Sequence, residues 1–193
     1  MIRAPWTLAK CSSISAAAAY FIYGFGATGQ VSPWIDEAEI IKRDPNSGAA
    51  IIVALATGVP VAKLKGVDAM TNANTVALVS QAVNPEAAIG FCSGETADAN
   101  QDKVNVLAYQ HFGQDCGYWP SSTASSFDKR NIRDGHYYLW APMHLFAHID
   151  GNGNPVSPGA AKLIGYFTRK LAPPAGVDMA KIEISAGGIP DCA

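Results

Sequence analysis

Strand-length apolar runs alternate with helix-length segments through the middle of this chain, and this alternation restricts the fold more than any other feature. Strands separated by helices of ten or more residues are typical of α/β domains, in which helices cover a sheet. The expected strands are Glu39–Arg43, Ala87–Cys92 and Val104–Tyr109, and the expected helices are Gly48–Thr57 and one of about Ala73–Val83 that starts after Asn72. The pattern predicts an α/β domain.

Two helices carry clear end signals. Ser47 is an expected N-cap for Gly48–Thr57, which Gly58 and Pro60 end. Ser157 is an expected N-cap for Pro158–Leu171, whose apolar residues form one stripe. Before this helix, the alternation of apolar residues over Tyr137–Ile149 predicts a strand.

These elements divide the chain into three segments. Residues 1–35 are expected to be irregular, with Ala16–Tyr23 open to either a helix end or a strand. Residues 36–110 are expected to form an α/β core, and residues 111–193 to hold the predicted strand and the helix 158–171.

Composition excludes several classes of protein. Hydrophobic residues make up 49% of the 193 residues and the net charge is only −2, which excludes a disordered chain. No run of Lys and Arg exceeds two residues, so we expect no nucleic-acid partner. No segment reaches the roughly 20 apolar residues of a membrane helix, so we expect no membrane span.

The N-terminus and the cysteines bear on the compartment. Ile14–Phe25 is apolar enough for a signal sequence, but its bulky aromatic residues do not suit a cleavage site, so we interpret the N-terminus as mature chain or a truncated start. The four cysteines allow three pairings, among which Cys116 with Cys192 is one hypothesis. An even cysteine count with few charges favours an exported protein.

Three short motifs lack the context that their chemistry needs. The glycine pattern of residues 24–29 resembles a dinucleotide fingerprint, but Pro33 follows where a helix should start, so we expect no such cofactor. His144 and His148 would lie about 13 Å apart on a strand, too far for one metal ion. The run that starts at Asp150 lacks the later glycine and glutamate of a calcium loop, so it predicts a turn.

Residues 90–94 (Gly-Phe-Cys-Ser-Gly) match a nucleophile elbow with cysteine as the nucleophile. An elbow needs a helix behind it, whereas residues 95–100 are polar and predict a loop. We therefore expect Cys92 to be buried or disulfide-bonded, and a hydrolase remains only as an alternative.

The strongest candidate site is the turn between the strand 39–43 and the helix 48–57. The strand delivers Arg43 beside a helix N-terminus, where free N–H groups and a partial positive charge favour an anion. Arg43 could form a bidentate pair with an oxyanion, while the Ser47 hydroxyl and the Gly48 N–H donate to it. The alternative is an ordinary N-cap beside a solvent-exposed arginine.

The order of several segments resembles the phosphate-binding proteins of ABC importers, which are type II periplasmic binding proteins. The segments are Arg43-x-x-x-Ser47-Gly48 and the helix after it, Gly66, Pro85–Phe91 (PEAAIGF) and Asn131–Pro142 (NIRDGHYYLWAP). The resemblance implies a type II-like α/β lobe with a mixed sheet flanked by helices, and an anion site at Arg43, Asp44, Ser47, Gly48 and Ala49. It also implies a periplasmic or extracellular solute-binding protein with an ABC permease as partner.

Three features of this chain differ from the family pattern. Ala49 replaces a threonine of the family, which removes one hydroxyl donor. Pro45 occupies the place of the acidic residue that accepts the proton of hydrogen phosphate, and Asp44 lies one position earlier, so another oxyanion remains open. The sequence matches the second lobe, so we expect it to lack most of the first lobe. The main hypothesis is thus a non-enzymatic, cofactor-free oxyanion-binding module. One alternative is an interaction module of the same fold, which would pair with another chain or with the missing first lobe. The other alternative is the Cys92 hydrolase.

Overall fold

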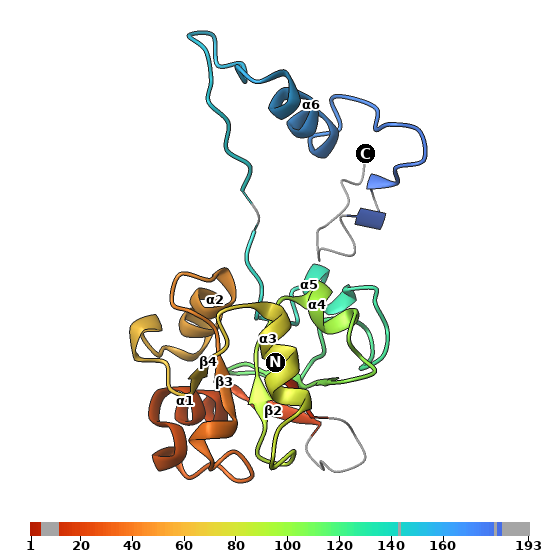
Figure 1. Ribbon diagram of the computed structural model, residues 1–193. Helices are drawn as coiled ribbons and strands as arrows, with labels where there is room; N and C mark the ends of the chain where they lie inside the picture. The colour runs from red at the N-terminus through yellow and green to blue at the C-terminus, as the bar shows by residue number, and fades with distance from the viewer. Residues whose placement is uncertain (5–11, 143, 180, 183–193) are drawn as a thin grey trace. The chain divides into compact units, whose positions relative to one another are not determined.

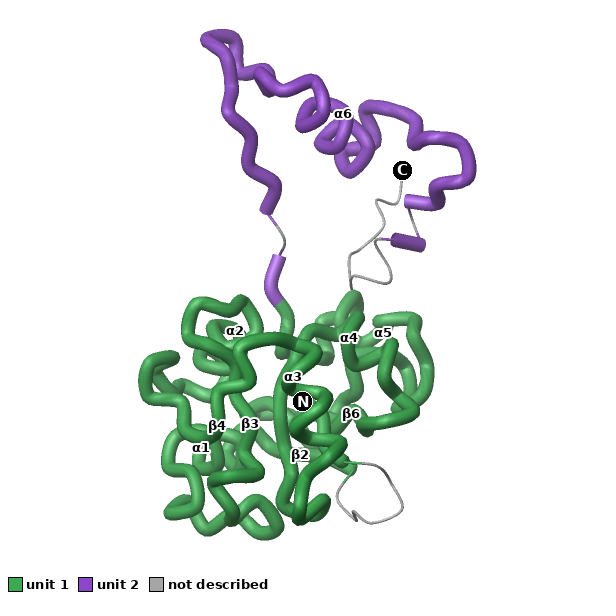
Figure 2. The backbone as a smooth tube through the Cα atoms, viewed as in Figure 1, with its two compact units in different colours: residues 1–140 green, residues 141–193 purple. Residues whose placement is uncertain are grey.

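The computed structural model describes residues 1–4, 12–142, 144–179 and 181–182. The chain forms two compact units, residues 1–140 and residues 141–193 (Figure 2).

A five-stranded mixed sheet forms the centre of the first unit (Figure 1). Its order is β4 (Val67–Asp68), β3 (Ile40–Lys42), β5 (Ile89–Gly90), β1 (Ile2–Arg3) and β6 (Asn105–Val106). β3 runs parallel to β4 and β5, whereas β1 runs antiparallel to β5 and β6. The chain therefore has the expected mixed α/β architecture, with a mixed sheet and flanking helices.

The described part of the first 35 residues contains two strands, a helix and a 3-10 turn, which corrects the expectation of an irregular segment. β1 lies inside the sheet, and β2 (Ser13–Ser15) pairs in parallel with β7 (Ala108–Gln110). The helix α1 (Ala16–Phe25) follows β2 at once, because the Ser15 side chain caps it by accepting from the Ala18 N–H at 3.1 Å. Burial of one face of α1 explains its stability: the buried side chains include Ala19, Ile22 and Tyr23. The 3-10 turn η1 (Gly26–Gly29) follows.

Two helices of the first unit match or nearly match the prediction. α2 (Gly48–Thr57) begins and ends where predicted, with Ser47 as N-cap and Gly58 in the left-handed conformation at its end. α3 (Asn72–Ser80) starts one residue earlier than expected because Thr71 caps it, and it ends three residues earlier.

Other boundaries differ more. The expected strand Val104–Tyr109 is two strands, β6 and β7, which belong to different sheets. The short helix α4 (Gly94–Asp98) lies where a polar loop was predicted, and the single turn α5 (Arg130–Arg133) follows later. Two further 3-10 turns are η2 (Glu37–Glu39) and η3 (Val61–Lys63).

The second unit contains α6 (Pro158–Phe167), capped by Ser157 as predicted. It ends four residues before the expected Leu171, because Arg169 adopts a positive φ of 59° and the Leu171 N–H returns to the Gly165 carbonyl. The strand expected over Tyr137–Ile149 is wrong for its described residues. The described residues of this segment pair with no strand. Tyr137 packs into the core of the first unit, and Ile149 forms an isolated bridge with Pro155. Among the described residues no helix is long and apolar enough to cross a bilayer.

Candidate functional site

The carboxyl ends of three neighbouring strands meet at one edge of the sheet. β4, β3 and β5 are adjacent and parallel, and a helix follows each of them: α3 after β4, α2 after β3 and α4 after β5 (Figure 1). In open α/β sheets, ligands bind outside the carboxyl ends of the strands. This edge therefore brings together residues near positions 43, 71 and 93, and it is the part of the fold best placed for a ligand.

Arg43 lies at this edge, one residue after β3. One terminal nitrogen of its guanidinium donates to the Asn72 side-chain oxygen, and the other donates to the Met70 carbonyl at 3.2 Å. Within the described part of the chain, its Nε is buried and has no hydrogen-bond partner. The guanidinium is thus fixed by α3 and the turn before it, with one buried donor still unused.

Asn72 connects all three loops. Its Oδ1 accepts from Arg43 and from the Ser93 N–H at 3.3 Å, and its Nδ2 donates to the Ser93 hydroxyl at 2.8 Å. The Ser93 and Thr96 hydroxyls are 2.9 Å apart. We call these four residues, Arg43, Asn72, Ser93 and Thr96, the edge network.

Sequence reasoning missed three members of the edge network. The sequence predicts only that the second helix starts after Asn72 and assigns no role to this side chain. Thr71 is the actual cap, since its hydroxyl accepts from the Asn74 N–H at 3.1 Å, and Asn72 is left to reach across to Arg43. The signal that could have found it is the sheet order, because adjacent parallel strands bring their following residues together.

The other predicted residues lie on the α2 side of the same turn. The Ser47 hydroxyl accepts from the Ala50 N–H at 3.2 Å, and the Asp44 carboxylate accepts from the Asn46 N–H at 2.9 Å. The N–H groups of Gly48 and Ala49 open α2, where no carbonyl of the helix can accept from them. Among the described residues, no hydrogen bond joins the Arg43 side chain to any of these. The grouping of Arg43 with Asp44, Ser47, Gly48 and Ala49 as a binding site stays a prediction.

An ion pair holds β3 and β4 together beside Arg43. Lys42 Nζ lies 3.2 Å from Asp68 Oδ2, and the other oxygen of Asp68 accepts from the Met70 N–H at 2.9 Å. Because Met70 in turn accepts from Arg43, this pair also fixes the loop that positions the guanidinium. The carboxylate of Asp68 is therefore already engaged by two donors.

Cys92 follows β5 by two residues and precedes α4, so the strand–turn–helix layout of a nucleophile elbow is present. Burial raises the pKa of the Cys92 thiol to about 11, despite the opposing charges of the N-terminus and Arg43. A thiol with this pKa is almost entirely protonated at neutral pH and is a poor nucleophile. Cys116 carries an exposed free thiol, and its hypothetical partner Cys192 lies outside the described residues.

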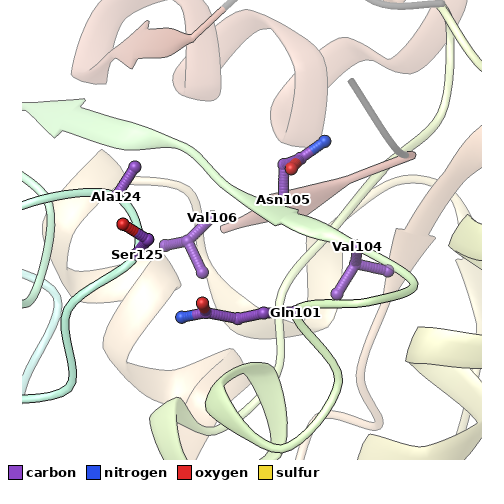
Figure 3. Close-up of a pocket in the computed structure, with 6 residues that line it drawn as sticks. All are labelled: Gln101, Val104, Asn105, Val106, Ala124 and Ser125. Atoms are coloured by element: carbon purple, nitrogen blue, oxygen red, sulfur yellow. The ribbon is translucent and has the colours of Figure 1, made fainter. Parts of the chain in front are cut away.

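Two hollows lie away from the edge network. One, of about 140 Å³, opens beside β6 and is shown in Figure 3, where Gln101 and Val106 lie close together and Asn105 points to the opposite side of the strand. The other is an open apolar groove of about 370 Å³ along α2 and η3. No member of the edge network lines either hollow.

Comparison with known proteins finds a likeness in structure. No family model and no curated protein matches the chain. One solved structure that resembles it is that of a possible phosphate binding protein from Planctomyces limnophilus DSM 3776, with a TM-score of 0.54 and 12% sequence identity. The matched parts of the two chains share a fold. The match covers 70% of this chain and 47% of the other, so this chain spans about half the length of its structural neighbour. At this identity the likeness concerns the fold alone.

Proposed function

We propose that this chain is a non-enzymatic, solute-binding lobe of type II periplasmic-binding-protein character that binds phosphate or a related oxyanion at the carboxyl edge of its sheet. Arg43 is the main contact, and Ser47, Gly48 and Ala49 at the start of α2 complete the site. The observation that carries the proposal is the buried, unpartnered Nε of Arg43 within the described residues.

An unsatisfied buried donor costs about 1–3 kcal/mol, and an anion that accepts from it removes this cost. A guanidinium has five N–H donors, and Arg43 uses only two of its nitrogens in contacts with Asn72 and Met70. Its fork geometry matches an oxyanion, and the unpaired N–H groups at the start of α2 add further donors with the helix dipole. The fold shared with a possible phosphate binding protein supports the same class of ligand.

The preference among oxyanions depends on acceptors as well as donors. Hydrogen phosphate carries a proton that needs an acceptor, and the Asp44 carboxylate is the acidic side chain nearest to Arg43 in sequence. That carboxylate is held within its own turn by the Asn46 N–H. We therefore test phosphate, sulfate and arsenate side by side.

The test is thermal unfolding in millimolar phosphate, sulfate or arsenate, with chloride at equal ionic strength as reference. A ligand at 100 times its Kd adds about 2.7 kcal/mol of stability, which is a shift of several degrees for this chain. The shift should vanish in Arg43→Met and persist in Arg130→Met, which removes the same charge from an exposed ion pair with Asp134. Equal shifts in both variants, or no shift in any salt, would contradict the proposal.

A second candidate function is an interaction module of the same fold. α2 contains only apolar residues apart from Thr57, and a helix that is apolar on every side is normally buried. Yet Leu55 is 80% exposed and Ile51 is 45% exposed, and both line the apolar groove. Sedimentation without anion separates the two functions: a mass that rises with concentration, and does not rise in Leu55→Ser, favours this candidate.

Location and transport follow from the family resemblance. We propose that the protein is exported to the periplasm or the extracellular space and delivers its anion to an ABC permease. Cell fractionation tests the first point.

The high pKa of Cys92 supports the non-enzymatic assignment over the thiol hydrolase, and ester turnover that Cys92→Ala abolishes would reverse that preference.

A further inference from the structure

A buried lysine supports the edge network from the far side of α4. Lys129 is 1% exposed, and its Nζ forms an ion pair with Asp98, the last residue of α4. Its backbone adopts a positive φ of 50°, and its N–H donates to the buried Ser121 hydroxyl at 3.2 Å. A left-handed conformation is unfavourable for a lysine, so its surroundings hold it in place firmly.

The Lys129 side chain lies across one face of α4. Its charged end meets Asp98, and its Cε would lie 3.6 Å from a Cβ placed on Gly94, one helical turn earlier. Residues four apart share one face of a helix. The Lys129 side chain therefore lies along this face of α4 from Asp98 toward Gly94.

α4 needs such support because it is only five residues long. Isolated helices of this length are unstable in water, so tertiary contacts fix both the existence and the direction of α4. On the other side, Thr96 of α4 shares a hydrogen bond with Ser93, and Ser93 bonds Asn72, which holds the Arg43 guanidinium. α4 thus transmits position from Lys129 to the proposed anion contact.

Stability alone does not explain a buried ion pair here. Taking two charges out of water is costly, and well-packed apolar residues of similar volume are often as stable or more stable. What an ion pair adds is a defined geometry at its two ends. Its two ends belong to segments 31 residues apart in sequence, α4 and the loop before α5.

We propose that Lys129 is a positioning residue for the oxyanion site, which acts through Asp98 and α4 to hold Asn72 and Arg43 in their binding geometry. This inference rests on the proposed function. It assigns to Lys129, which follows Asp98 of α4 by 31 positions in sequence, a part in anion affinity.

The experiment compares the full chain with Lys129→Met/Asp98→Leu, which removes both charges at once and so leaves no unpaired buried carboxylate. Phosphate and sulfate affinities are measured by calorimetry, and stability without anion by thermal unfolding. We expect the double variant to unfold near the wild-type temperature and to bind about tenfold more weakly, as for the loss of an outer-shell partner. Arg130→Met, a neighbouring exposed position, is the matched control and should bind like wild type.

A second measurement does not depend on the anion. The Ala97 N–H donates to the Ser93 carbonyl inside α4 at 3.1 Å, and its hydrogen exchange reports how firmly α4 is held. Exchange should be faster in the double variant and unchanged in Arg130→Met. Wild-type affinity together with wild-type exchange in the double variant would overturn the inference. If the wild-type chain binds no anion, both the proposed function and the positioning role fail. If the double variant exchanges faster but binds anion with wild-type affinity, Lys129 supports α4 only and the positioning role fails.

Discussion

Gly66 lies closer to the backbone of β3 than any other amino acid would allow, in the sheet that carries the candidate site. Its φ is +104°, and a Cβ placed there would lie 2.2 Å from the Ile40 carbonyl oxygen and 2.9 Å from the carbonyl carbon. These are backbone atoms of β3, so no side-chain rotation can relieve the contact. Gly66→Ala must move β4 away from β3 or distort one of them.

The expected cost combines two effects. A non-glycine residue with positive φ costs roughly 1–2 kcal/mol, and an overpacked contact adds about 1–3 kcal/mol. The sum is about 2–5 kcal/mol, which lowers the melting temperature of a chain of this size by on the order of 10 °C. The same displacement moves Met70 and Asn72 away from Arg43, so anion affinity should fall as well.

Gly58→Ala is the matched control. Gly58 also has a positive φ, +79°, but a Cβ there meets nothing within 4 Å. Its substitution therefore carries the backbone strain alone, about 1–2 kcal/mol, and should lower the melting temperature by a few degrees. Thermal unfolding of both variants by circular dichroism measures the difference. Equal melting temperatures for the two variants would refute the contact between Gly66 and β3.

Four further predictions concern single side chains. Ser47→Ala removes the cap of α2 and should cost about 1 kcal/mol in urea unfolding, whereas Ser47→Gly should cost only a few tenths; equal losses would count against the cap. Iodoacetamide at pH 8 should alkylate the exposed Cys116 well before Cys92, whose pKa burial raises to about 11, and mass spectrometry at timed intervals would expose equal rates. Burial lowers the pKa of His111 below 6.5, so at a pH near 6.5 the unfolded chain binds more protons than the folded chain. The free energy of unfolding should therefore fall as the pH drops through 6.5 and level off below the folded pKa. Thermal unfolding at several pH values should show a flatter slope for His111→Phe. Hydrogen bonds from Ser122 lower the pKa of Asp128 from 3.8 to about 2, so its contribution is present above pH 3.8 and is lost as the pH falls toward 2, a dependence that Asp128→Asn should remove.

Elements with signals in their own sequence could be predicted to the residue. α2 is the clearest case, because Ser47 and Gly58 supply a cap and a left-handed end within the segment itself. α6 has the same kind of start at Ser157, but its end depends on Arg169 adopting a positive φ, which an arginine rarely does. Local chemistry decides a boundary only where the residue type strongly prefers the conformation.

Elements that depend on distant partners could not be predicted. β1 has two residues, too few for any periodicity, and it exists because β5 and β6 pair with it on both sides. α4 was missed for a related reason, since it lacks an apolar stripe and its contacts run to Lys129 and, through Ser93, to Asn72. The candidate site divides in the same way. Arg43 could be found from its turn, whereas Asn72 becomes part of the site only through the order of the strands.

The place of β1 in the sheet has a consequence for folding. Ile2 pairs with Gly90 and with Val106, so β1 cannot form its pairs until residues 88 and 104 positions later have been synthesised. Contacts so distant in sequence are slow to form, because a long loop must close first. Until residue 106 has left the ribosome, β1 can pair only with β5 and has an open edge where β6 should lie, and such edges can pair with other chains. The sheet is therefore completed late in synthesis, and the nascent chain is most exposed to aggregation in the interval before β6 arrives.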